Sequence, residues 1–285
     1  MSISPVPPWP LPDGVKSERV NGYDLAYVEH GAGVPVVFVH GGGLDYRYFS
    51  PQMEPFGQHY RAIAISLRHC YPEPWGGEGE FSLDQHALDL TKFIRKNASE
   101  PVHLVGYSRG GTVSLYAARL APDLIRTLTF VEGGSGMQAF APEDPTLHDL
   151  GDRVMHTVAA RLASGDVDGA LERYLEFANG PDSWDKLPRS VKGWFRDNAW
   201  TLAAASRYTL SPFSCADALA LDLPVLLVGA DGSPPQFGAI LDRLQPCLRR
   251  AERVLLTSAS HGMSRTNAAE FNAAVLAFIA RSGSR

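Results

Sequence analysis

Residues 106–110 read G-Y-S-R-G, which places a serine between two glycines in the pattern G-x-S-x-G. The preceding residues, VHLVGY, are apolar and β-branched, and the following residues have helical spacing, so the motif lies between a strand and a helix. In that context the glycines permit a sharp turn that holds the serine exposed, in a strained conformation, at the end of the strand. We therefore expect Ser108 to act as a nucleophile in acyl transfer and not only to form a turn.

The rest of the chain predicts the sheet that must position this serine. Helical patterns, including 82–96 and 110–120, alternate with short apolar strands expected at 34–39, 61–66, 102–107, 125–131, 223–228 and 253–256. This alternation is typical of an α/β fold with a mostly parallel central sheet flanked by helices. From residue 135 to 208 helical patterns continue without a strand. We predict a core formed by 1–134 and 209–285, and a helical cap at 135–208 over the edge where such sheets bind ligands.

Residues 40–43, H-G-G-G, end the first of these apolar strands. Together with the G-x-S-x-G turn and the order of motifs along nearly the whole chain, they make the sequence similar to the α/β-hydrolase superfamily, specifically its serine hydrolase and esterase branch with a helical cap. The resemblance implies that the backbone N–H groups of Gly42 and Arg109 form an oxyanion hole, which would stabilise the negative oxygen of a tetrahedral intermediate.

The resemblance also places the general base at His261, which among the nine histidines is the one late in the chain, in a loop at a strand end. Two carboxylates remain open as the acid that orients it. Family members usually carry the acid three residues after the glycine that closes the penultimate strand, but that position is Gly232 here, and Asp231 lies one residue too early. A minority carry it where this chain has Glu132. Because a carboxylate directly after a buried strand needs a partner, we favour Glu132 and keep Asp231 as the alternative.

The side chain of Arg109 has two interpretations. We favour an ion pair with a nearby carboxylate, and the alternative is contact with an anionic or polar group of the substrate. The other candidates for the substrate pocket are aromatic or imidazole side chains, each with ordinary packing as the competing interpretation: Tyr107, His69, Tyr71, Trp194 and Trp200.

Composition excludes several other classes of protein. With 26 Lys and Arg against 31 Asp and Glu, the net charge is −5, which argues against nucleic-acid binding. No apolar run approaches a membrane span, and the N-terminal residues do not form a secretory signal. The three cysteines, Cys70, Cys215 and Cys247, lack metal-ligand spacing and predict reduced thiols in a cytoplasmic protein. We expect no metal, no organic cofactor and no membrane partner.

These residues predict a serine hydrolase that cleaves a small-molecule carboxylic ester or lactone with a bulky apolar part through an acyl-enzyme at Ser108. The same residues could instead cleave a C–C bond in a diketone-like substrate. A third interpretation, from a different class, is a ligand-binding receptor on a hydrolase fold. A serine at position 108 argues against dehalogenase and epoxide hydrolase chemistry, which resemble this fold but need an aspartate there.

Overall fold

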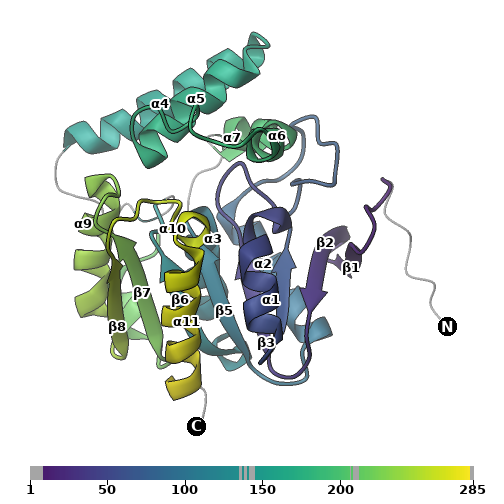
Figure 1. Ribbon diagram of the computed structural model, residues 1–285, viewed down its shortest axis with the longest axis vertical. Coiled ribbons are helices and arrows are strands. Elements are labelled where there is room, and N and C mark those ends of the chain that lie inside the picture. The colour runs from purple at the N-terminus through teal and green to yellow at the C-terminus, as the bar shows by residue number, and fades with distance from the viewer. Residues whose placement is uncertain are drawn as a thin grey trace.

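The computed structural model of the protein describes residues 9–134, 137, 140, 145–205, 207 and 212–282. Its strands are β1 (Lys16–Val20), β2 (Tyr23–His30), β3 (Pro35–Val39), β4 (Arg61–Ile65), β5 (Val102–Tyr107), β6 (Ile125–Val131), β7 (Val225–Ala230) and β8 (Ala251–Leu256). They form one eight-stranded sheet in the order β1-β2-β4-β3-β5-β6-β7-β8 (Figure 1). The pairs from β4 to β8 are parallel, whereas β1 pairs with β2, and β2 with β4, in antiparallel orientation.

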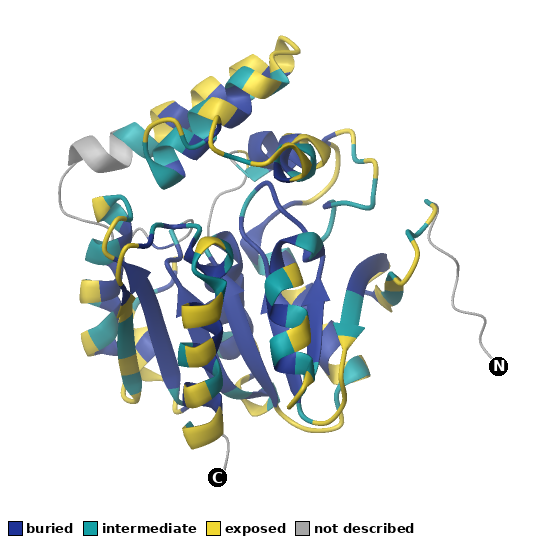
Figure 2. Ribbon diagram, in the orientation of Figure 1, coloured by how far each residue is buried: buried dark blue, intermediate teal, exposed yellow. Residues whose placement is uncertain are grey.

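Alternation of side chains along the strands gives the sheet two buried faces. In β3, Val37 and Val39 belong to one hydrophobic cluster and Val36 and Phe38 to the other. The first cluster packs against α2 (Leu83–Asn97), α3 (Arg109–Leu120), α8 (Cys215–Leu219) and α9 (Pro235–Leu244). The second packs against α1 (Ser50–Gly57), α10 (Met263–Thr266) and α11 (Ala268–Ser282). Figure 2 shows the central strands as buried and the outer helix faces as exposed.

Five chain segments follow the carboxyl ends of parallel strands and therefore meet at one edge of the sheet. They are the turn at Gly41–Gly43 after β3, called the glycine turn below, Ser108 after β5, Glu132 after β6, Asp231 after β7 and the loop 257–262 after β8. Every site residue favoured by the sequence interpretation thus lies near the same edge.

Four helices between β6 and β7 lie over this edge (Figure 1): α4 (Pro145–Ala163), α5 (Val167–Asn179), α6 (Arg189–Asp197) and α7 (Ala199–Ala205). Many of their buried side chains, including Leu171, Phe195 and Leu202, belong to the same cluster as Phe38 of the sheet. This part of the structure contains helices and no strand among its described residues. The predicted boundaries at 135, 208 and 209 fall outside the described residues, so the division into core and cap remains a proposal.

The sequence interpretation did not include β1, β2 and α1. The segment KSERV of β1 carries three charged residues, which conceal the alternation of a half-exposed edge strand. In α1, Pro55 lies inside a short helix and obscures its period. The ends of other helices and strands differ from the predicted ones by one or two residues. The strand β7, for example, begins at Val225 and not at 223.

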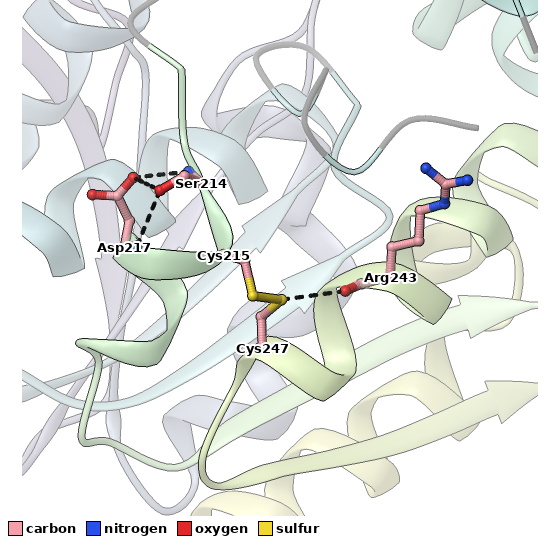
Figure 3. The surroundings of a disulfide bond; sticks show 5 residues. All are labelled: Ser214, Cys215, Asp217, Arg243 and Cys247. Carbon is pink, nitrogen blue, oxygen red and sulfur yellow. Dashed lines mark hydrogen bonds between the residues drawn. A yellow bond between two sulfur atoms is a disulfide. The ribbon is translucent and has the colours of Figure 1, made fainter. Parts of the chain in front are cut away.

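The prediction of three reduced thiols is wrong for two of the cysteines. Cys215 and Cys247 form a disulfide that joins the first residue of α8 to the turn after α9, and only Cys70 is free and buried (Figure 3). Ser214 and Asp217 cap α8 reciprocally and fix its first turn, which presents Cys215 to its partner. The two cysteines are 32 residues apart, so their spacing in the sequence gave no sign of the contact. A cytoplasmic location therefore no longer follows from the cysteines.

Candidate active site

Ser108 occupies a sharp turn between β5 and α3. Its backbone has φ 52° and ψ −122°, a left-handed conformation that is costly for a residue with a side chain. The turn is held because the Ser108 N–H donates to the Val131 carbonyl at 2.8 Å. It also requires a glycine at 106, since a Cβ there would lie 2.5 Å from the Gly110 carbonyl oxygen. Close packing of the residues on both sides of Ser108 thus holds its backbone in this strained conformation.

His261 reaches Ser108 from the loop that follows β8. Its Nε2 lies 3.1 Å from Ser108 Oγ, and its side chain is almost completely buried. The imidazole stacks on Phe237 of α9, with ring centroids 3.9 Å apart and planes 9° apart, and Tyr107 lies at 5.0 Å on a tilted plane. These rings restrict the orientation of the imidazole, so its two nitrogens face fixed partners.

Glu132 contacts the other nitrogen of this imidazole. Its Oε2 lies 2.8 Å from His261 Nδ1 and also accepts a hydrogen bond from Ser233 Oγ at 2.8 Å. Its Oε1 accepts from the Ala230 N–H at 2.9 Å. A carboxylate that is 1% exposed therefore has a partner for each oxygen, which offsets the cost of removing it from water.

Asp231, the alternative acid, is exposed and binds a different part of the histidine loop. Its two carboxylate oxygens accept from the backbone N–H groups of Ser258 and Ala259, at 3.1 and 3.2 Å. These hydrogen bonds hold the pKa of Asp231 below its usual value, because they stabilise the charged form. The structure brings Ser108, His261 and Glu132 together, and it places Asp231 against the backbone two and three residues before His261.

The glycine turn after β3 packs directly against the nucleophile. A Cβ on Gly41 would lie 3.1 Å from Ser108 Cβ, so glycine is needed for this approach. The side chain of His40 holds the turn: its Nε2 accepts from the Leu67 N–H at 3.0 Å, and its Nδ1–H donates to the Gly41 carbonyl at 2.8 Å. Burial lowers the pKa of His40 to about 4, so the ring is neutral near pH 7, as this pair of hydrogen bonds requires.

Arg109 contributes two different groups. Its backbone N–H is in the first turn of α3, where no carbonyl of the helix can accept it, so it is free to face Ser108. Its side chain turns toward α2 and is 5% exposed, with Nη2 donating to the Phe81 carbonyl at 2.8 Å. Within the described residues no carboxylate forms an ion pair with it. The favoured expectation of an ion pair therefore finds no partner among the described carboxylates.

The aromatic candidates for the pocket separate into two groups. Tyr107 lies beside His261 and stacks on Tyr48, at 4.7 Å between ring centroids. The other four candidates lie in the loop after β4 or in α6 and α7, which contact that loop. His69 stacks on Trp75, Tyr71 and Trp194 receive the guanidinium of Arg47 on their ring faces, and Trp200 is 41% exposed near Gly77.

Three side chains other than the pocket candidates named above lie against the glycine turn. The Tyr174 hydroxyl is 3.5 Å from the Gly42 carbonyl oxygen, and Cβ atoms built on Gly42 and Gly43 would meet Leu202 and Phe195 within 3.5 Å. A cavity of about 440 Å³ opens between α5 and the loop after β7 and is lined by residues that include Phe177, Ser233 and Gln236. Ser233 thus links this cavity to Glu132.

The described residues show no cluster of side chains able to hold a metal ion. None of their helices has the length and apolar character needed to cross a bilayer.

The chain and its fold are similar to known proteins. A family model described as alpha/beta hydrolase fold matches residues 34–174. An esterase of Mycobacterium tuberculosis is 29% identical over 124 residues, which cover 43% of this chain and 40% of the esterase. A non-heme haloperoxidase of Rhodococcus erythropolis is 24% identical over 272 residues, 91% of this chain and 97% of that protein.

Among solved structures, the enol-lactonase of Burkholderia xenovorans LB400 superimposes with a TM-score of 0.74 at 18% identity, covering 93% of this chain and 100% of the lactonase. The chain spans less than half the length, 40% to 44%, of the first curated relatives that it matches, which are hydrolases. The family model, the sheet order and the structural likeness agree, and the chain belongs to the α/β-hydrolase fold family.

Proposed function

We propose that the protein is a serine hydrolase that cleaves a carboxylic ester or lactone through an acyl-enzyme at Ser108. Ser108 Oγ forms a bond to the substrate carbonyl carbon while its proton moves to His261 Nε2. The alcohol oxygen then leaves with that proton. Water attacks the acyl carbon, gives a proton to His261, and the carboxylic acid departs as Ser108 recovers its hydrogen.

The observation that carries this proposal is the chain of contacts from Ser108 Oγ to His261 at 3.1 Å and from His261 to Glu132 at 2.8 Å. Glu132 fixes the imidazole with its proton on Nδ1 and stabilises the imidazolium that forms in the reaction. The N–H groups of Gly42 and Arg109 are proposed to bind the oxyanion, which is typically worth 10²- to 10³-fold in kcat per donor.

The proposed substrate is a small molecule with a bulky apolar part. Tyr174, Phe195 and Leu202 provide an apolar wall over the glycine turn, and the cavity beside Ser233 offers room on the other side. Relatives named as an esterase and an enol-lactonase act on esters and lactones, which supports this choice of bond. The helices between β6 and β7 are proposed to form a cap, 135–208, on a core of 1–134 and 209–285. A cytoplasmic location also stays a proposal, to be tested by fractionation.

The test is labelling with a fluorophosphonate probe, combined with turnover of a graded panel of esters and lactones. The wild-type protein and a Ser164→Ala control, changed at an exposed serine after α4, should be labelled and active. Ser108→Ala should be unlabelled and lose at least about 10³-fold in kcat, because the three groups act as a unit.

Retention of more than a tenth of wild-type turnover in Ser108→Ala would rule out the serine mechanism. Absence of labelling in the wild type would favour the receptor interpretation. Labelling with cleavage of diketones and no cleavage of esters would favour C–C hydrolysis.

A further inference from the structure

The guanidinium of Arg109 is a buried cation whose hydrogen bonds are incomplete. Nη2 contacts the Phe81 carbonyl and lies 3.4 Å from His86 Nδ1, and Cζ lies 4.8 Å from the centre of the Phe81 ring. Nε is fully enclosed and has no partner, and the same is true of His86 Nε2. Nη1 makes no hydrogen bond to any described residue, but it is not fully enclosed, so it is the donor that a ligand can reach.

No carboxylate among the described residues forms an ion pair with this guanidinium, and three carboxylates of α2 and the surrounding loops bind other groups. Asp89 forms an ion pair with Arg68, Asp45 with Arg47, and Glu73 binds Tyr23 and His69. The thiol of Cys70 is not an anion either, since burial raises its pKa well above the usual value. Burial lowers the pKa of Arg109 itself to about 10, so the side chain still carries its charge at neutral pH. A buried cation without an anion is costly, and a bound anion would remove that cost.

Arg109 begins α3 and extends its guanidinium toward α2, against Phe81 and His86. It is the residue after Ser108, so their Cα atoms are about 3.8 Å apart. Its charge also acts on the Tyr174 hydroxyl, which lies against the Gly42 carbonyl on the glycine turn. The first turn of α3 adds partial positive charge from its free N–H groups.

We infer that Arg109 binds a carboxylate of the substrate, so that the preferred substrates are esters that carry a carboxylate a few carbons from the scissile carbonyl. This inference rests on the proposed function and specifies its substrate class. Phe81 and His86 hold the guanidinium in place, and Nη1 donates to the substrate carboxylate as a charge-assisted hydrogen bond.

The test compares matched pairs of esters that differ only in a terminal carboxylate. The 4-nitrophenyl monoesters of succinate, glutarate and adipate are paired with 4-nitrophenyl butyrate, valerate and hexanoate. A second arm, 4-acetoxybenzoate against 4-methylphenyl acetate, places the carboxylate on the alcohol side. We expect the wild type to prefer the anionic member of at least one pair in kcat/KM by tenfold or more, with an optimum in chain length.

Arg109→Met should reduce this anionic-to-neutral ratio by about 10- to 100-fold, the range of a charge-assisted hydrogen bond, and Arg109→Lys should retain part of it. Arg119→Met is the matched control: Arg119 is in the same helix, but its ion pairs are with Asp84 and Asp217. The ratio should not change in this variant. An equal loss for both members of every pair in Arg109→Met would show a structural role and overturn the inference.

A binding measurement keeps the inference testable if Arg109→Met does not fold. Free glutarate should inhibit hydrolysis of 4-nitrophenyl butyrate competitively and raise the Tm of the wild type, with a smaller rise in Arg109→Lys. Hydrolysis of neutral esters without any anionic preference and without glutarate binding would overturn this inference and leave the proposed function standing. Failure of fluorophosphonate labelling and of all ester hydrolysis would instead remove the proposed function, while glutarate binding would still report on the anion site.

Discussion

Glu132 and Asp231 follow neighbouring parallel strands, yet they bind different atoms of the same loop. Glu132 contacts the imidazole of His261, whereas Asp231 accepts from the backbone of Ser258 and Ala259. A carboxylate on Nδ1 enforces the tautomer that leaves Nε2 free to accept the proton of Ser108. A carboxylate on the backbone only restricts where the loop lies. The two residues should therefore differ in kcat and not merely in stability.

We predict that Glu132→Gln lowers kcat by about 10⁴-fold, because an amide no longer enforces the tautomer or stabilises the imidazolium. Asp231→Asn should lose far less, since the amide oxygen can still accept one of the two backbone hydrogen bonds. Steady-state kinetics on the best ester, with circular dichroism to verify folding, measures both. Near-full activity in Glu132→Gln, or a larger loss in Asp231→Asn, would assign the acid to Asp231.

At the scale of elements, Asn198 is a buried polar link between the helices over the sheet edge and the loops that follow β3 and β4. It lies between α6 and α7 and is 1% exposed. Its amide nitrogen donates to Asp45 at 2.7 Å, and its amide oxygen accepts from the Tyr71 N–H at 2.8 Å. Arg47 joins the same cluster through Asp45 and Asp197. Buried hydrogen bonds of this kind fix one arrangement of two packed elements.

Asn198→Ala should lower the free energy of unfolding by about 1–3 kcal/mol, because it leaves buried partners without hydrogen bonds. Arg196→Ala is the control, since Arg196 is in α6 and forms an exposed ion pair with Asp168, which should contribute less than about 1 kcal/mol. Urea unfolding of the two variants and the wild type measures the difference. Equal effects would indicate that the Asn198 contacts do not hold these helices to the sheet.

At the scale of the whole molecule, three buried histidines couple folding to pH. Burial lowers the pKa of His40 and of His103 to about 4, and burial together with the Arg109 charge lowers that of His86 well below its usual value. In the unfolded chain these groups titrate near 6.5. Between pH 6.5 and about 4 the unfolded chain therefore binds protons that the folded protein does not bind. Stability is fully present above pH 6.5 and falls as the pH is lowered through this window.

We predict that the free energy of unfolding falls between pH 6.5 and 5, with each histidine contributing up to about 1.4 kcal/mol per pH unit. This interval excludes most of the carboxylate titration, which lies near and below pH 4. His103 is distant from Ser108 and bonds Thr127 from β5, so His103→Gln should reduce the slope by up to one proton. Urea unfolding at pH 7, 6 and 5 measures the slope. An unchanged slope in this variant would show that His103 binds its proton equally well in the folded and the unfolded protein.

The sequence alone determined the parallel strands β3 to β8 and the turns at their ends. Apolar runs of strand length and the glycines around Ser108 and after His40 are local signals, because each reports the backbone of its own segment. The α/β fold and the family membership predicted from them are confirmed by the sheet order and the family match. The roles of Ser108, His261 and Glu132 were also inferred from the sequence, and they stay predictions until the variants are measured.

Only the tertiary structure decided which side chains meet across the sheet edge. His261 lies 129 residues from Glu132 along the chain, and their contact depends on β6, β7 and β8 lying side by side with a fixed register. The same holds for the Cys215–Cys247 disulfide and for Tyr174 against the glycine turn. Arg109 is a further example. Arg47 and Arg68 form ion pairs with Asp45 and Asp89, whereas no described carboxylate pairs with Arg109, and these pairings depend on contacts between distant segments that no local sequence pattern reports.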